Sequence, residues 1–153
     1  MNRIKKYDEC AVELDALLEV EAGMISNLAN ATALIHHKFG FFWTGFYLVD
    51  GEKLTLGPFQ GPVACTFIEK GKGVCGTSWL RAESIVVPDV HKFPGHISCN
   101  PESKSEIVLP IYSKKGEIIA ILDIDSKVID DFNESDKIGL EPLTAIITRK
   151  LDI

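Results

Sequence analysis

The spacing of apolar residues changes near Phe41, and this change limits the folds that the chain can adopt. Before it, apolar side chains recur at steps of three and four residues, which is the pattern of amphipathic helices. Gly23 lies inside that pattern. Within a continuous helix, a glycine lowers the stability of the helix by about 1 kcal/mol relative to alanine. We therefore predict two helices with a break near residues 20–23, the second ending near Gly40.

From Phe41 onward the sequence consists mainly of short runs of aromatic and β-branched residues, which favour strands. Asp50-Gly51 separates two such runs and predicts a hairpin turn. The other predicted elements are a strand at 63–68, a short helix at 74–81, a strand at 84–87, a hairpin of strands 106–112 and 117–125, and a helix from about 134 to 151 with Asn133 as its N-cap and Asp136 at its third position.

Helices at both ends, hairpins between them and no regular alternation of strand and helix predict an α+β fold. Its central, mainly antiparallel sheet would be flanked by N-terminal helices and a C-terminal helix. A length of 153 residues is typical of one domain, so we expect a single domain over residues 1–153. Residues 88–105 are expected to form a long loop, and such loops in compact domains are usually functional or disordered.

Charge and hydropathy exclude several classes of function. Sixteen basic and 22 acidic residues give a formal net charge of −6 with no basic block, so no nucleic-acid partner is expected. The longest apolar run, Ile118–Leu122, is far shorter than the roughly 20 residues that cross a bilayer, and no signal peptide is visible. We predict a cytoplasmic protein that has no membrane segment and uses no cofactor.

Three acidic residues are predicted to meet at the open end of the second hairpin. With an even-length loop, residues whose numbers sum to 229 face each other, so Glu106 would lie opposite Asp123, with Asp125 on the diagonal. The same register predicts one apolar core face, formed by Ile107, Leu109, Ile111, Ile118, Ala120, Leu122 and Ile124.

Like charges that face each other across a hairpin are destabilising, so the acidic cluster needs an explanation. A lysine, a divalent metal or the ammonium group of a ligand would remove the conflict. Alternatively, one carboxyl group keeps its proton because its neighbours raise its pKa. A solvated strand end without a role is the remaining interpretation.

The four cysteines fall into two groups. Cys10 lies on the apolar stripe of the first helix and is predicted to be a buried, inert thiol. Cys65, Cys75 and Cys99 lie at loops or element ends, where thiolate formation and access are both favoured. A redox role fits these three better than zinc, because gaps of ten and 24 residues differ from the spacing of zinc ligands.

Aromatic and histidine side chains add further candidates. Trp43 and Tyr47 on the first strand are candidates for the wall of an apolar pocket, whereas Phe46 is more simply explained as core. His91 and His96 lie in the same predicted loop as Cys99, where a protonated imidazole would favour its thiolate. Either histidine would also be available to a zinc site, although we expect no metal.

Five segments carry a resemblance to a known family: Trp43–Leu48, Gln60–Cys65, Gly71–Thr77, Val87–Cys99 and Ser105–Pro110. They resemble the free methionine-(R)-sulfoxide reductases, which are single-domain enzymes with a GAF fold. The resemblance runs from roughly Tyr7 to Leu151. The spacing of the three cysteines separates these reductases from GAF domains that only bind ligands.

The resemblance implies roles for the three cysteines and for protein partners. Cys99 would attack the substrate, Cys65 would resolve the reaction by forming a disulfide with it, and Cys75 would be an accessory or alternative resolver. The family's reductant is thioredoxin, and its members are commonly homodimers.

The resemblance also implies a substrate site. Glu106, Asp123 and Asp125 match the acidic residues around the substrate's amino group and sulfoxide, and Trp43 matches the aromatic residue that holds its methyl group. Tyr47 is expected beside Trp43. We therefore predict reduction of free L-methionine-(R)-sulfoxide through a sulfenic acid and an intramolecular disulfide. A GAF sensor that binds a small ligand without turnover is the alternative, and a structural zinc domain is a third possibility.

Overall fold

A six-stranded antiparallel sheet forms the middle of the molecule, with strand order β3-β2-β1-β6-β5-β4. The computed structural model describes residues 3–97 and 99–153, so Ser98 of the Val87–Cys99 segment lies outside the described residues. The strands are β1 (Trp43–Asp50), β2 (Lys53–Gln60), β3 (Phe67–Glu69), β4 (Ile85–Val87), β5 (Ser105–Tyr112) and β6 (Ile118–Ser126).

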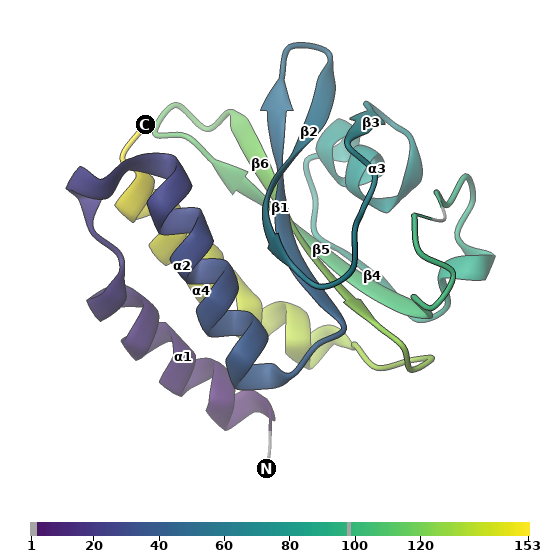
Figure 1. The fold of residues 1–153 in the computed structure, drawn as a ribbon, viewed down its shortest axis with the longest axis horizontal. Coiled ribbons are helices and arrows are strands. Elements are labelled where there is room, and N and C mark those ends of the chain that lie inside the picture. The colour runs from purple at the N-terminus through teal and green to yellow at the C-terminus, as the bar shows by residue number, and fades with distance from the viewer. Residues whose placement is uncertain (1–2, 98) are drawn as a thin grey trace.

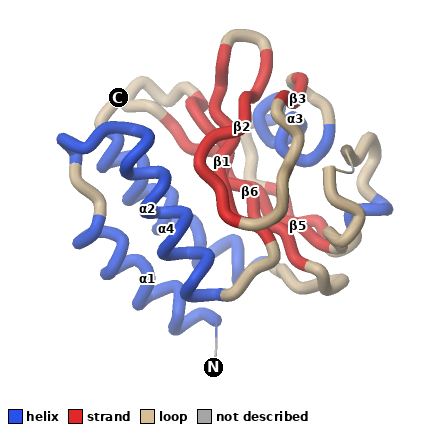
Figure 2. Tube along the Cα trace, viewed as in Figure 1, coloured by secondary structure: helices blue, strands red, loops and turns tan. Residues whose placement is uncertain are grey.

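Three long helices cover one face of this sheet and leave the other face to a short helix and the loops (Figure 1). The long helices are α1 (Arg3–Leu17), α2 (Gly23–Phe39) and α4 (Glu134–Leu151), and the short one is α3 (Gly73–Arg81). In Figure 2 the long helices lie together on one side of the strands. The predicted α+β class is confirmed. Among the described residues, no helix has both the length and the apolar character needed to cross a membrane.

Local signals in the sequence located the ends of the helices correctly. Gly23, with a φ of 81°, follows a short 3-10 turn at Val20–Ala22 and begins α2. Gly40 ends α2 in the left-handed conformation, with φ 69°, and its N–H donates to the His36 carbonyl. At α4, Asn133 and Asp136 form a capping box. The Asn133 side chain accepts a hydrogen bond from the backbone N–H at the third helical position, and the Asp136 side chain accepts one from the backbone N–H of Asn133, which is the predicted N-cap.

The predicted register of the second hairpin is wrong by two residues. Glu106 faces Asp125 rather than Asp123, and Asp123 faces Val108. The turn has three residues, since the Ser113 N–H donates to the Glu117 carbonyl, and the pairing shifts by one more residue between Ile111 and Tyr112. Each of these features moves the pairing by one residue, so together they move it by two. Because side chains alternate between the two faces, a shift of two leaves every residue beyond the irregularity on its predicted face.

Two smaller predictions also need correction. The register shift exchanges the faces of two neighbours, because Ile119 packs against the helix-covered core whereas Ile118, predicted there, packs on the opposite face. The strand predicted at 63–68 is restricted to Phe67–Glu69, and residues 63–66 form part of the connection from β2. That connection passes over the open face of the sheet and forms one wall of the site.

Each face of the sheet has its own core. The helix-covered core is the larger and contains Phe46, Leu122 and the buried thiol Cys10, each fully inaccessible to solvent. The core of the open face is formed by residues of all six strands and of α3, including Trp43, Tyr47, Val108, Ile121 and Trp79. The predicted burial of Cys10 and the core position of Phe46 are confirmed.

Candidate active site

A pocket of about 60 Å³ lies on the open face of the sheet. A cavity needs roughly 10–15 Å³ of such volume for each water molecule that it holds, so this pocket has room for only a few waters. That is the size of a small metabolite rather than of a nucleotide. Strands β1, β5 and β6 form its floor, and the first turn of α3 and two loops form its walls. The lining residues are Phe42, Trp43, Tyr47, Val63, Ala64, Ile68, Lys72, Gly73, Val74, Cys75, His96, Ile97, Cys99, Asn100, Ser103, Glu106, Asp123 and Asp125.

The three predicted acidic residues do meet in this pocket. Glu106 on β5 faces Asp125 on β6, and Asp123 lies two residues along β6 on the same side of the sheet. Glu106 and Asp123 are each only 6% exposed. The Asp123 Oδ1 atom is buried and has no hydrogen-bond partner among the described residues. A buried carboxylate oxygen without a partner is costly, so the arrangement is prepared for a cationic or proton-donating ligand.

Burial dominates the electrostatics of this cluster. It raises the pKa of Glu106 and of Asp125 well above the usual carboxyl range, and the neighbouring carboxylate of Asp123 adds to both shifts. Burial also raises the pKa of Asp123, although hydrogen bonds from Glu106, Cys75 and Asp125 act in the opposite direction. The three adjoining carboxyl groups therefore hold protons more tightly than ordinary carboxyl groups do, and a bound cation would favour the release of those protons.

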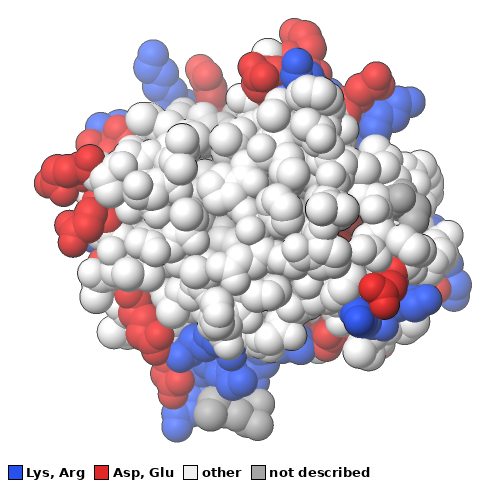
Figure 3. Space-filling model, viewed as in Figure 1, with Lys and Arg blue, Asp and Glu red and all other residues white. Residues whose placement is uncertain are grey.

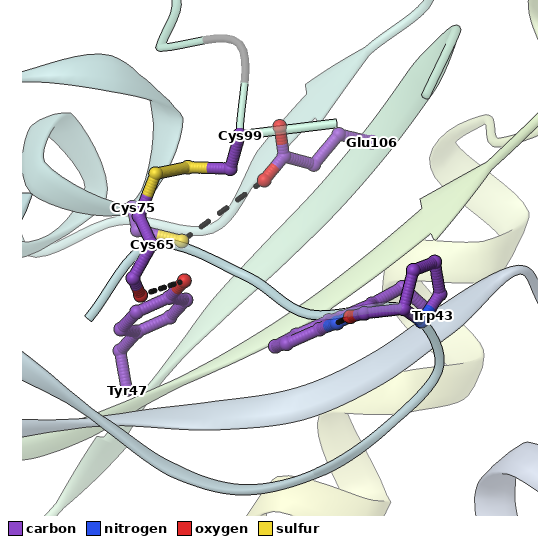
Figure 4. The surroundings of a disulfide bond; sticks show 7 residues. Trp43, Tyr47, Cys65, Cys75, Cys99 and Glu106 are labelled. Carbon is purple, nitrogen blue, oxygen red and sulfur yellow. Dashed lines mark hydrogen bonds between the residues drawn. A yellow bond between two sulfur atoms is a disulfide. The ribbon is translucent and has the colours of Figure 1, made fainter. Parts of the chain in front are cut away.

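Cys65 and Cys99 form a disulfide at the edge of the pocket, with their Cα atoms 5.4 Å apart across a sequence separation of 34 residues. Figure 4 shows the bond beside the side chains of Glu106 and Tyr47. The pairing that the family resemblance implied is therefore present. Cys99 lines the pocket directly, and both cysteines are half-buried. The sulfur chemistry and the acidic cluster consequently belong to one site.

The third predicted cysteine, Cys75, is a free and buried thiol in the first turn of α3. Its Sγ lies 4.0 Å from Glu106 Oε2, the contact drawn as a dashed line in Figure 4. Burial, followed by the charges of Asp123 and Glu106, raises the pKa of Cys75 well above that of a free thiol. Cys75 is therefore protonated at neutral pH and is a poor nucleophile.

Trp43 and Tyr47 form the aromatic wall, as predicted. The indole N–H of Trp43 donates to the Pro62 carbonyl at 2.9 Å, and the Tyr47 hydroxyl donates to the Cys65 carbonyl at 2.9 Å. Both bonds hold the 61–66 connection against β1. Gly61, with φ 129°, is required here, because a Cβ atom at that position would lie 2.7 Å from the Trp43 ring.

Several lining residues were not singled out from the sequence. Ile97 packs over Gly73, which has a φ of 62° and where a Cβ atom would lie 3.1 Å from the isoleucine side chain. The paired glycines of the Gly71–Thr77 segment were the available signal for this close approach. Phe42, Asn100 and Ser103 carried no comparable signal, because their place in the wall depends on how the loops fold back.

The two loop histidines have different positions. His96 lines the pocket, and burial lowers its pKa, so it is neutral at pH 7. His91 points to Asp89 instead, with Nδ1 3.1 Å from the carboxylate. The zinc set considered from the sequence is not assembled, because Cys65 and Cys99 are joined to each other. A different potential ligand group exists among the described residues: donor atoms of Cys75, Glu106 and Asp123 all lie within 4.8 Å of one another.

Comparison with known proteins agrees with this fold. The GAF domain family model matches residues 3–146. The chain is 54% identical to GAF domain-containing protein A of Dictyostelium discoideum, over 87% of this chain and 84% of the relative. These matches define the general class as a GAF domain protein.

Two further matches define the class more narrowly. The free methionine-R-sulfoxide reductase of Escherichia coli is 42% identical over 99% of this chain and 92% of its own. A crystal structure of free methionine-R-sulfoxide reductase from Neisseria meningitidis in complex with its substrate is 40% identical, with a TM-score of 0.92 over 99% of this chain and 91% of that one. The chain belongs to the GAF domain family and, within it, to the free methionine-R-sulfoxide reductases.

Proposed function

We propose that this chain reduces free methionine-R-sulfoxide to methionine at the pocket described above. The observation that carries the proposal is the position of a cysteine pair, Cys65 and Cys99, beside a buried cluster of three carboxyl groups. Relatives of this chain that are named free methionine-R-sulfoxide reductases support the same reaction.

The acidic cluster selects a free amino acid over a methionine sulfoxide residue within a peptide. A free amino acid carries an ammonium group, which satisfies the unpartnered Asp123 Oδ1 and compensates the charge of Glu106 and Asp125. Peptide-bound methionine sulfoxide lacks this group and would leave the carboxylates buried without a partner. The aromatic wall of Trp43 and Tyr47 suits the apolar methyl end of the same molecule.

The reaction begins when the Cys99 thiolate attacks the sulfoxide sulfur. A protonated carboxyl group, Glu106 or one of the aspartates, donates a proton to the oxygen, since burial keeps their pKa high. Methionine leaves and Cys99 becomes a sulfenic acid, so the substrate sulfur is reduced by two electrons and the cysteine sulfur is oxidised by two. Cys65 then attacks the sulfenic sulfur, which forms the disulfide and releases water.

Cys75 has a supporting role in this scheme. Its thiol is protonated, lies against Glu106 and is not part of the disulfide. It is therefore placed to orient the acidic cluster or to act as an alternative resolver, whereas Cys99 performs the attack.

An external dithiol completes the cycle by exchange with the Cys65–Cys99 bond, and we assign this step to thioredoxin in the cytoplasm. The side chains beside Cys65 leave room for a protein reductant. Val63 is 85% exposed and Phe67 is 59% exposed, two residues before and after the cysteine. Exposed apolar side chains next to a disulfide are a suitable contact for a protein that must reach it.

A homodimer is the expected assembly, with the outer side of α2 as its interface. Residues 23–37 include no Lys, Arg, Asp or Glu, and Ile25 on this helix is 75% exposed. In Figure 3, which has the same view as Figure 1, α2 lies on the side of the molecule that faces the viewer, and charged side chains lie mainly around the margin of that side. Ile25→Asp should therefore shift the protein to monomers in sedimentation velocity, whereas an unchanged sedimentation coefficient would exclude this interface.

The direct test is methionine release from free L-methionine-R-sulfoxide with dithiothreitol as reductant. Wild type should turn over and Cys99→Ser should not, with a loss of at least about a thousandfold in kcat, as for other removed nucleophiles. Cys10→Ala is the matched control, because Cys10 is buried in the opposite core and should be dispensable.

Other outcomes would assign the protein differently. A folded, reduced wild type that binds the sulfoxide without turnover would be a ligand sensor. Turnover by Cys99→Ser would transfer the attack to Cys65 or Cys75. N-acetylmethionine sulfoxide tests the role of the cluster, because equal kcat/KM for the acetylated and free substrates would show that the ammonium group is not recognised.

A further inference from the structure

The buried thiol of Cys75 and its two nearest carboxyl groups form a set of potential metal ligands. One sulfur atom and two carboxylate oxygens, from Cys75, Glu106 and Asp123, lie within 4.8 Å of one another and are all buried. The Asp123 Oδ1 atom has no partner within the described part of the chain, although the residue is only 6% exposed. Three converging donors and an unpartnered oxygen indicate a ligand that accepts electron pairs and carries positive charge.

We propose that this group binds a thiophilic divalent cation, with Zn²⁺ as the preferred ion, and that the bound ion excludes the substrate. Zinc bonds of about 2.3 Å to sulfur and about 2.1 Å to oxygen give a separation of about 3.6 Å between the sulfur and an oxygen ligand at the tetrahedral angle. Cys75 Sγ and Glu106 Oε2 are 4.0 Å apart, so this pair needs to approach by only a few tenths of an ångström, and the Asp123 donor lies within 4.8 Å of both. A water molecule would occupy the fourth position, on the pocket side.

The combination of donors sets the choice of ion. A thiolate is a soft ligand that favours zinc and other late transition metals, whereas Mg²⁺ and Ca²⁺ prefer six or more oxygen atoms. When the ion binds, the Cys75 thiol releases its proton to solvent and the sulfur donates an electron pair to the metal. No oxidation or reduction takes place. Because the ion would occupy Glu106 and Asp123, which the substrate ammonium also needs, it would act as an inhibitor of the site and not as a cofactor of the reaction.

Competition with substrate follows from the shared carboxylates and rests on the proposed function. The ammonium group of methionine sulfoxide and the cation would both require Glu106 and Asp123. Cys75 is outside the disulfide, so the metal site exists in the oxidised protein too. Binding can therefore be measured without a thiol reductant, which would itself take up zinc.

The experiment is a titration of the oxidised wild-type protein with Co²⁺, which reports a thiolate ligand through a charge-transfer band in the near ultraviolet. We expect one equivalent of Co²⁺ to produce the band and Zn²⁺ to displace it. Cys75→Ser should abolish the band, and Asp123→Asn should weaken Co²⁺ binding at least tenfold. Cys10→Ala, which removes the other free thiol, should leave the titration unchanged.

The outcomes separate the metal site from the proposed function. A missing band in folded wild type, or a band that persists in Cys75→Ser, would overturn the metal site while leaving the reductase activity to its own assay. Addition of free methionine sulfoxide should abolish the cobalt band, whereas N-acetylmethionine sulfoxide should not. A band that free methionine sulfoxide does not affect would overturn the competition and the proposed position of the substrate ammonium, but not metal binding.

Discussion

The two faces of the same sheet differ in what they bury. On the helix-covered face, β5 and β6 present apolar side chains along their length, with serines only at the paired ends Ser105 and Ser126, and Leu122 is completely buried in this core. On the open face, the neighbouring residue Asp123 carries a carboxyl group that is almost as deeply buried. One step along a strand thus separates a residue that stabilises the fold from one that opposes it. Burial on the first face favours folding, and burial on the second prepares a binding site.

The largest effect should come from removing packing on the helix-covered face. Leu122→Ala should lower the free energy of unfolding by about 2–5 kcal/mol, because the cavity cannot be filled by rigid neighbours. Urea denaturation followed by circular dichroism measures this loss. Activity per folded molecule should stay within about twofold of wild type. A loss below about 1 kcal/mol would mean that this face is less tightly packed than the structure indicates.

The opposite sign is expected for a neutral replacement on the open face. Glu106→Gln should raise the free energy of unfolding at pH 7 by about 0.5–2 kcal/mol, since it removes a buried acid from a cluster of like charges, and it should lower kcat/KM. Glu117→Gln is the matched control, because Glu117 is exposed on the same hairpin. Its effect should stay within about 0.5 kcal/mol. Destabilisation by Glu106→Gln would show that the cluster supports the fold.

The pH dependence of stability should sharpen the same comparison. Burial raises the pKa of Glu106 and Asp125 in the folded state, so the folded protein binds more protons than the unfolded chain. The stability that these two groups contribute is fully present below about pH 4, the carboxyl pKa of the unfolded chain. It is lost as pH rises through their pKa values in the folded protein. The advantage of Glu106→Gln in thermal melts should therefore grow between about pH 4 and pH 8. A constant difference across that range would contradict the raised pKa of Glu106.

The smallest effect concerns the edge of the open face. Phe67→Ala should slow turnover with thioredoxin about fivefold, equivalent to about 1 kcal/mol, because it removes an exposed apolar side chain next to the disulfide. Turnover with dithiothreitol should not change. Val12→Ala is the control, since Val12 is 73% exposed on α1, in the other layer. Equal slowing with both reductants would place the effect in the chemistry instead of in protein docking.

Elements that depend on neighbouring residues could be predicted accurately. The break at Gly23, the end of α2 at Gly40, the Asp50-Gly51 turn and the Asn133 cap are each fixed by interactions within a few residues. The register of β5 and β6 was missed, because the apolar period is two and gives no information about an even shift. The acidic cluster was still predicted on one face, since a shift of two residues preserves the face of Glu106, Asp123 and Asp125.

The sequence alone therefore determined the class of fold, the two apolar faces of the sheet and the strand end at which the acidic residues gather. Only the tertiary structure brought Cys75 against Glu106 and placed the Cys65–Cys99 pair, which the family resemblance had implied, at the rim of that cluster. Local periodicity describes how a segment distributes its side chains between two faces, and it extends only a few residues along the chain. Contacts across 31 and 34 residues depend on how loops close over the sheet, which is decided by the packing of the whole molecule.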